Sequence, residues 1–282
     1  MNKRIAEEKV FKSLMMLSVA IVIGSLVLII ATIFMNGALS LSFEMISQTS
    51  SGGYYLGRSG GILNAILGSI FLALPATGLA YLISLGIALY LQRDFLHPKI
   101  ASLIRFSLDI LWGIPSIIYG VFGLMIMVAI GIGASLLAGI FALTLLEIPI
   151  ITRSIDECIK MVPNGLKEGS YSLGSTSFET AFKVVRKQAM PGIIAGVLLG
   201  LGRGIGDAAS ILFTAGFSDS IPTSLMDSTA ALPTMIYHLY SSPIPLVREK
   251  AYAAAFILIV IVTAISVISR CMIKRCRKYV IK

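Results

Sequence analysis

Arg203 and Asp207 are two opposite charges, four residues apart, inside an apolar stretch that runs roughly from Pro191 to Phe217. If this stretch is one membrane-spanning helix, the two side chains lie on nearly the same face. A charge at the membrane centre costs about 2.5–3.5 kcal/mol on insertion scales. An Arg four residues before an Asp is also the weaker order for an ion pair. The mutual attraction of the two residues is therefore a weak reason for their presence.

We interpret Arg203 as a positive charge presented to a passing anion, with Asp207 orienting it and weakening its hold on that anion. The alternative, a structural ion pair that fixes helix packing, stays open. Small residues on the same face favour close packing, because stripes of small residues let two membrane helices approach each other. These residues recur every four positions and are Gly192, Gly196, Gly200 and Gly204.

No other reactive set is readable from the residues. The sequence holds no G-x-x-x-x-G-K-[ST] loop for ATP, and the run from Gly200 to Gly206 lacks the G-x-G-x-x-G spacing. His97 and His238 have no Cys or His at metal-ligand spacing. We therefore expect no enzyme activity, no metal and no cofactor. We expect free thiols at all three cysteines, Cys158, Cys271 and Cys276.

The elements that position these residues follow from composition. The chain has 282 residues, of which 56% are hydrophobic and 13% charged, with a mean hydropathy of +0.91. Soluble domains carry about 25% charged residues, so lipid is the expected solvent. A membrane span must be a helix or part of a closed barrel, and the apolar runs are too long for barrel strands. The net charge of +9 then reflects membrane topology, not a nucleic-acid surface.

Six apolar stretches predict six transmembrane helices, each about 20 residues or longer. The second and fifth are long enough to require tilt or an extension beyond the bilayer. The first is too long for a signal peptide, and we expect it to be retained. The stretches run roughly over Ser13–Met35, Ile62–Leu91, Phe106–Ile130, Ala134–Ile151, Pro191–Phe217 and Ala251–Met272.

The distribution of Lys and Arg predicts that both termini are cytoplasmic. Basic residues gather in the N-terminal tail, between the second and third stretches, between the fourth and fifth, and in the C-terminal tail. The intervening loops hold only Arg58, Arg248 and Lys250. Of these loops, residues 36–61 are rich in Gly and residues 218–250 are rich in Pro. Each loop either contacts an external partner or only connects two spans, and both interpretations stay open. Within the second loop, we expect the short apolar piece Leu232–Tyr240 to lie on the membrane surface.

One cytoplasmic segment, Met161–Ala189, has the pattern of a short helix, a glycine turn at Gly174 and a second helix. Thr176 and Glu179 form a capping-box pattern at the start of the second helix. The pattern predicts a projecting knob, although a solvated loop explains it equally well.

The same segment resembles the cytoplasmic coupling loop of type I ABC importer permeases. The likeness lies in Val162–Gly174 (VPNGLKEGSYSLG), with Glu168 and Gly174 at the spacing of that motif. Two alanines of the motif are replaced by Gly169 and Ser170. The resemblance implies a coupling loop at about residues 160–180 that docks into a separate ATPase through Pro163, Leu166, Glu168 and Gly174.

Two further segments are similar to phosphate-importer permeases, and to their PstA subfamily in particular. They are residues 111–123 (LWGIPSIIYGVFG) and residues 202–216 (GRGIGDAASILFTAG). The usual Glu of the second motif is Asp207 here. The resemblance implies a six-helix, all-α permease of the type I fold in the inner membrane of a prokaryote. Its regions would be residues 1–61 (tail, first helix and outer loop), 62–273 (permease core) and 274–282 (basic tail).

The resemblance also implies partners: a second, PstC-like permease, two copies of an ATPase subunit and an external phosphate-binding protein. Arg203 and Asp207 then lie in the substrate path, and the glycine stripe packs against the second permease. We expect Asp109 and Glu147, near the ends of their stretches, to snorkel or to pair at the membrane interface. Arg153 and Glu157 are expected to be structural.

Three rival functions remain on sequence grounds. The same machinery could carry another oxyanion, tungstate or molybdate, which the two phosphate-importer segments disfavour. An ATP-independent anion channel or secondary transporter would leave the coupling-like loop without a purpose. A membrane-bound enzyme lacks any convergent set of reactive residues.

Overall fold

The structure is a computed structural model that describes residues 2–50 and 60–276, and its described residues are helical without any strand. Part of the predicted outer loop (residues 51–59) and most of the predicted basic tail (from residue 277) lie outside the described residues. The helices are α1 (Asn2–Ser40), α2 (Phe43–Ser47), α3 (Leu63–Tyr90), α4 (Pro98–Gly113), α5 (Ser116–Ala129), α6 (Leu136–Lys160), α7 (Asn164–Ser172), α8 (Ser177–Glu179), the π-helical turn η1 (Thr180–Val185), α9 (Arg186–Gln188), α10 (Met190–Gly206), α11 (Leu232–Tyr240) and α12 (Pro245–Cys276).

Long apolar helices dominate the described residues, as predicted. Four of them, α1, α3, α6 and α12, are each long and apolar enough to cross a membrane. Two bent pairs of helices raise the number of spans to six if each pair is counted as one. The all-α architecture is therefore confirmed, but one predicted span, Phe106–Ile130, is divided by the first bend. The second bend lies just before the predicted span Pro191–Phe217, where the knob helices meet α10.

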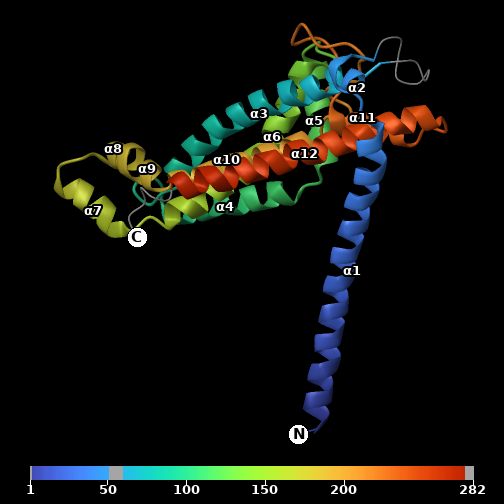
Figure 1. Cartoon of the computed structure of the whole chain (residues 1–282). Coiled ribbons are helices and arrows are strands. Elements are labelled where there is room, and N and C mark those ends of the chain that lie inside the picture. The colour runs from blue at the N-terminus through green and yellow to red at the C-terminus, as the bar shows by residue number, and fades with distance from the viewer. Residues whose placement is uncertain (1, 51–59, 277–282) are drawn as a thin grey trace.

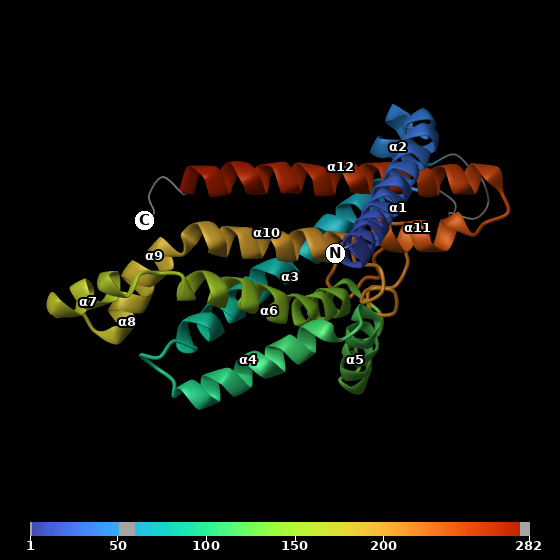
Figure 2. The same cartoon turned by 90° about the horizontal axis from the view of Figure 1, so that it is seen from below.

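The bundle consists of α3, α4, α6, α10 and α12, which run side by side with α6 in contact with α3, α4 and α10 (Figures 1 and 2). The short helices α7, α8 and α9 project from one end of the bundle, and α2, α5 and α11 gather at the other (Figure 1). We call these the α7 end and the α11 end.

Helix α1 stands away from the bundle and meets it near its own C-terminus (Figure 1). There Gly37 permits a close approach, because a Cβ at this position would lie 2.5 Å from the Tyr252 carbonyl oxygen. The rings of Phe34 and Phe256 pack edge to face at 5.4 Å. The rest of this predicted first span leaves its apolar side chains exposed.

The third predicted span, Phe106–Ile130, is not one helix: α4 and α5 meet at 99°. The cause lies in Pro115, which has no N–H to donate and which disfavours a helical conformation in the residue before it. Ile114 is accordingly extended, with φ −70° and ψ 131°. The predicted single span is corrected to a helix, a proline break and a second helix across the α11 end.

The fifth predicted span is also wrong at its C-terminal end, since α10 ends at Gly206 and not near Phe217. Asp207 has an extended backbone, with φ −82° and ψ 119°. The residues after it run without helix into the core, where Ile211 and Ala215 are buried. Apolar composition alone therefore overestimated the length of the helix.

Helix α11 has the predicted bounds, and one of its faces packs inside the protein. Leu232, Met235 and Leu239 are fully buried and pack in one cluster with residues of α3 and α12. Tyr237 and Tyr240 remain exposed on the other side. This helix is thus part of the core at the α11 end.

Candidate functional site

The glycine stripe of α10 packs against α6 of the same chain. A Cβ at Gly196 would lie 2.8 Å from the Ser154 Cβ, and a Cβ at Gly200 would lie 2.7 Å from the Ile151 side chain. Gly192 meets Cys158 in the same way. The prediction of a close-packing face is right, but its predicted occupant, a second permease, is corrected: α6 fills the stripe.

Replacing Gly200 with Val is expected to destabilise the protein by about 2 kcal/mol, because the added methyl groups must displace the fully buried Ile151. Gly202→Val is the matched control. It makes the same change of helix propensity on the same helix, but a Cβ at Gly202 has no neighbour within 4 Å in the described structure. Thermal unfolding of each variant in detergent measures the difference. Equal melting temperatures for the two variants would contradict the packing assignment.

Glu147 occupies the α6–α10 contact and not the membrane interface predicted for it. Its side chain is fully buried, and neither carboxylate oxygen has a hydrogen-bond partner among the described residues. A Cβ at Gly200 would lie 3.7 Å from its Oε2, and a Cβ at Gly204 would overlap its Oε1. The buried carboxyl that borders the Arg203 segment is therefore Glu147, which the sequence reasoning misplaced.

Arg203 and Asp207 do not form the predicted pair on one helix face. Arg203 is the exposed member, in the last turn of α10, and it makes no ion pair within the described ranges. Asp207 lies past the helix end, and its Oδ2 accepts hydrogen bonds from the Ser210 backbone N–H (2.8 Å) and from the Ser210 hydroxyl. Asp207 thus stabilises the turn that ends α10.

The turn after Asp207 packs against α5, which brings α5 and the end of α10 together. A Cβ at Gly120 of α5 would lie 2.6 Å from the Ser210 carbonyl oxygen. One residue earlier, Tyr119 lies within electrostatic range of Arg203 and donates a hydrogen bond to the Leu111 carbonyl (2.8 Å). The proline break between α4 and α5 therefore helps to build the surroundings of Arg203.

The predicted knob is confirmed at the α7 end. Helix α7 is followed by Gly174, whose φ of +81° suits glycine, and by α8. The predicted capping box is formed: the Glu179 N–H donates to the Thr176 Oγ1 (3.3 Å), and the Thr176 N–H donates to the Glu179 carboxylate (3.1 Å). A bond of 2.9 Å between the hydroxyls of Ser170 and Thr180 ties α7 to η1.

The four predicted docking residues all belong to this knob. Pro163, Glu168 and Gly174 are exposed, whereas Leu166 packs against the core cluster. The structure adds two apolar residues that the motif did not single out, Leu173 and Phe178, which are 88% and 67% exposed. Leu173 lies in the turn between α7 and α8, which we call the knob tip, and Phe178 stacks on Phe182 beside the end of α3. The sequence motif pointed to this segment through Glu168, but only the fold shows that these two apolar side chains are exposed.

A buried acid, Asp156 of α6, joins three cations beside the knob. Its carboxylate accepts two hydrogen bonds from Arg105 of α4 (2.8 and 2.9 Å). It also pairs with Lys160 (2.9 Å) and Arg153 (3.2 Å). Arg153 bonds in turn to Asp109 (2.6 Å), so the prediction that Asp109 pairs is confirmed.

Arg153 also pairs with Glu157 (3.1 Å), which supports the structural role predicted for both residues. All three cysteines are free thiols, as predicted. Within residues 2–50 and 60–276, no group of three or more His, Cys, Asp or Glu side chains is placed to hold a metal ion.

Comparison with known proteins gives one family and several relatives. A family model described as binding-protein-dependent transport system inner membrane component matches residues 80–278. The phosphate transport system permease protein PstA 2 of Mycobacterium tuberculosis is 36% identical over 217 residues, which cover 76% of this chain and 72% of the relative. The phosphate transport system permease protein PstA of Haemophilus influenzae is 32% identical over 267 residues, or 95% of this chain and 94% of the relative.

Among solved structures, the chain is similar to one from the inward-facing methionine ABC transporter MetNI. The TM-score is 0.61 at 21% identity, and the match covers 76% of this chain and 95% of the other. At this identity the likeness describes the fold alone: that of an ABC importer permease.

Proposed function

This chain belongs to the family of binding-protein-dependent transport system inner membrane components, and we propose that it is the permease subunit of an ATP-driven importer of inorganic phosphate. The observation that carries the proposal is the extent of the likeness to a PstA permease, which runs through 95% of this chain. Phosphate is favoured over tungstate or molybdate because the relatives are named as phosphate permeases.

The physical support for an anionic substrate is Arg203. Its guanidinium is exposed at the end of α10 and makes no ion pair with the part of the chain that is described. A guanidinium presents several N–H donors in a fixed plane, which suits the oxygens of a phosphate. Asp207 acts here by holding the turn that ends α10, and so it positions Arg203 without competing for its charge.

The energy for transport comes from ATP hydrolysed by a separate subunit, present in two copies beneath a pair of permeases. The knob of α7–α9 docks into that ATPase. The hydrogen bonds that join its helices, between Ser170 and Thr180 and within the capping box, support this role, because a docking element must transmit force. A second, PstC-like permease completes the substrate path, and a binding protein delivers phosphate at the α11 end.

The membrane is the cytoplasmic membrane of a prokaryote, and both termini lie on its cytoplasmic side. The support is the gathering of Lys and Arg near the α7 end of the bundle and in the N-terminal tail. This orientation puts the knob where an ATPase with access to cellular ATP can reach it.

Leu173→Glu is expected to lower ATPase binding by about tenfold and to uncouple ATP hydrolysis from transport, because a charge replaces an apolar contact at the knob tip. The fold is expected to survive, since Leu173 is 88% exposed. Leu225→Glu, at the α11 end and 52% exposed, is the matched control. Co-purification of the ATPase with each variant is the measurement, and equal yields would remove the knob tip from the docking surface.

The proposed function is tested by uptake of labelled phosphate into proteoliposomes that hold both permeases and the ATPase. Uptake is expected only with both binding protein and ATP present. Tungstate and molybdate at matched concentrations test the anion, and success of either with failure of phosphate would change the substrate. Uptake without the ATPase would instead indicate a channel or a secondary transporter.

A further inference from the structure

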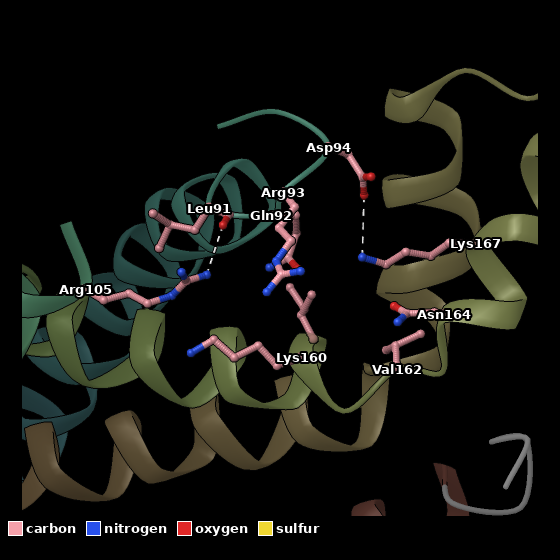
Figure 3. A pocket seen from close by; sticks show the side chains of 10 residues that line it. Leu91, Gln92, Arg93, Asp94, Arg105, Lys160, Val162, Asn164 and Lys167 are labelled. Carbon is pink, nitrogen blue, oxygen red and sulfur yellow. Dashed lines mark hydrogen bonds and ion pairs between the residues drawn. The ribbon is translucent and has the colours of Figure 1, made fainter. Parts of the chain in front are cut away.

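A cavity of about 460 Å³ lies at the α7 end, where the turn after α3 meets α4, the end of α6 and α7 (Figure 3). It is distinct from the surroundings of Arg203, which lies about 13 residues along α10 from the α7 end, a distance on the order of 20 Å. Its lining includes an amide, that of Asn164, and the charged side chains of Arg93, Asp94, Arg105, Lys160 and Lys167.

The lining carries more positive than negative charge. Arg105 and Lys160 share one buried acid, Asp156. Lys167 reaches Asp94 only at 3.5 Å. Arg93 is exposed and has no ion-pair partner in residues 2–50 or 60–276. Lys160 also pairs with Glu157 at 2.9 Å. Four cations thus line the cavity, against Asp94 in the lining and Asp156 and Glu157 behind it.

The donors converge from separate elements. Arg93 belongs to the turn after α3 and Lys167 belongs to α7, and Figure 3 shows these two side chains extending toward the same space. Lys160, at the end of α6, lines the cavity from the side of Arg105 and pairs with Asp156 and Glu157. The amide of Asn164 adds a neutral donor at the start of α7. Convergence of this kind concentrates positive potential in a hollow and attracts oxyanions.

We propose that this cavity binds a phosphate-type oxyanion, either free inorganic phosphate or the headgroup phosphate of an anionic lipid. Arg93 supplies the planar pair of donors, and Lys167 supplies a point charge from the other side of the cavity. Lys160, which already pairs with Asp156 and Glu157, adds only to the positive potential. The volume equals that of about 15 water molecules, which accommodates a hydrated phosphate or a lipid headgroup. A bound oxyanion would link Lys167 of the knob to Arg93 of the bundle.

The site does not rest on the proposed transport function, because binding is measured without transport. The full chain carries Arg203→Gln, so that this arginine contributes nothing, and is placed in nanodiscs of phosphatidylcholine. Equilibrium binding of radiolabelled inorganic phosphate is compared after adding Arg93→Gln or Arg270→Gln. Arg270 is the matched control, an exposed arginine on α12 that does not line the cavity.

The second arm uses nanodiscs that also contain phosphatidylglycerol, with inorganic phosphate absent, and native mass spectrometry to count the retained lipids. Arg93→Gln is expected to weaken the binding of one of the two ligands by about tenfold, and Arg270→Gln is expected to leave it unchanged. Arg93→Lys is expected to restore part of the binding, because it returns the charge without the fork of donors.

Loss of phosphate binding with Arg93→Gln supports the free anion, and loss of phosphatidylglycerol retention supports the headgroup. If neither ligand is held, or if the two Gln variants behave alike, the proposal is overturned. It is also overturned if neither ligand binds and Arg93→Gln instead weakens binding of the ATPase, since the cavity is then a contact for acidic side chains of that protein.

Discussion

Replacing Arg203 with Gln is expected to lower ATP-driven phosphate uptake by about 100-fold while the protein still folds and assembles. Charge-assisted hydrogen bonds from an arginine to an anion contribute about 1.5–3 kcal/mol, and Gln keeps neither the charge nor the fork of donors. Assembly is expected to persist because the side chain is exposed and makes no ion pair in the described structure. The measurement is initial uptake of labelled phosphate in proteoliposomes with ATP and binding protein.

Two companion variants separate this role from a general loss of charge. Arg203→Lys retains the charge without the planar donors, and it is expected to keep part of the activity at a weaker apparent affinity. Arg248→Gln removes an exposed arginine at the start of α12 and is expected to transport normally. Full uptake by Arg203→Gln, with normal assembly, would exclude Arg203 from the substrate path.

The features that the sequence predicted correctly depend on local chemistry. The capping box at Thr176 and Glu179 formed because both of its hydrogen bonds lie within four residues. The bounds of Leu232–Tyr240 were right because Pro233 favours a helix start and no competing signal intervenes. The free thiols and the pairing of Asp109 were also predicted correctly, in the latter case without its partner, Arg153.

The errors arose where hydropathy continues but the backbone changes course. Residues 106–130 are mostly apolar, yet the chain turns through 99° at Pro115. Asp207 was read as the next turn of a helix, but its side chain bonds to Ser210 and ends that helix. An Asp residue can either continue a helix or end it by accepting a hydrogen bond from the backbone that follows. The sequence alone does not determine which of these two conformations forms.

The sequence also did not identify the helix that packs against the glycine stripe of α10. A glycine stripe predicts that some helix approaches closely, but the period of four is the same whether that helix belongs to this chain or to another. Ser154 and Ile151 fill the stripe from within the chain. The burial of Glu147 follows from the same contact, and it could have been anticipated only by knowing that α6 is the neighbour.

Asp156→Ala is expected to be the most destabilising single change, at about 3 kcal/mol, because one buried carboxylate neutralises cations from two helices. Its side chain is fully inaccessible, whereas Arg105 is 21% and Arg153 19% exposed, so water offsets only part of the loss. Without the acid, Arg105 keeps its bond to the Leu91 carbonyl (2.9 Å) but loses both of its bonds to α6. Contact between α4 and α6 should therefore weaken first.

Glu157→Ala is the matched control on the next residue, since Glu157 also pairs with Arg153 and Lys160 but is 55% exposed. Exposed pairs contribute about 0–1 kcal/mol, so its melting temperature in detergent should stay near that of the native protein while that of Asp156→Ala falls by several degrees. Equal melting temperatures for the two variants would mean that burial adds nothing to this network. In that case solvent would have to reach Asp156, contrary to its position between α4 and α6, and the attachment of α4 to the bundle would depend on apolar packing alone.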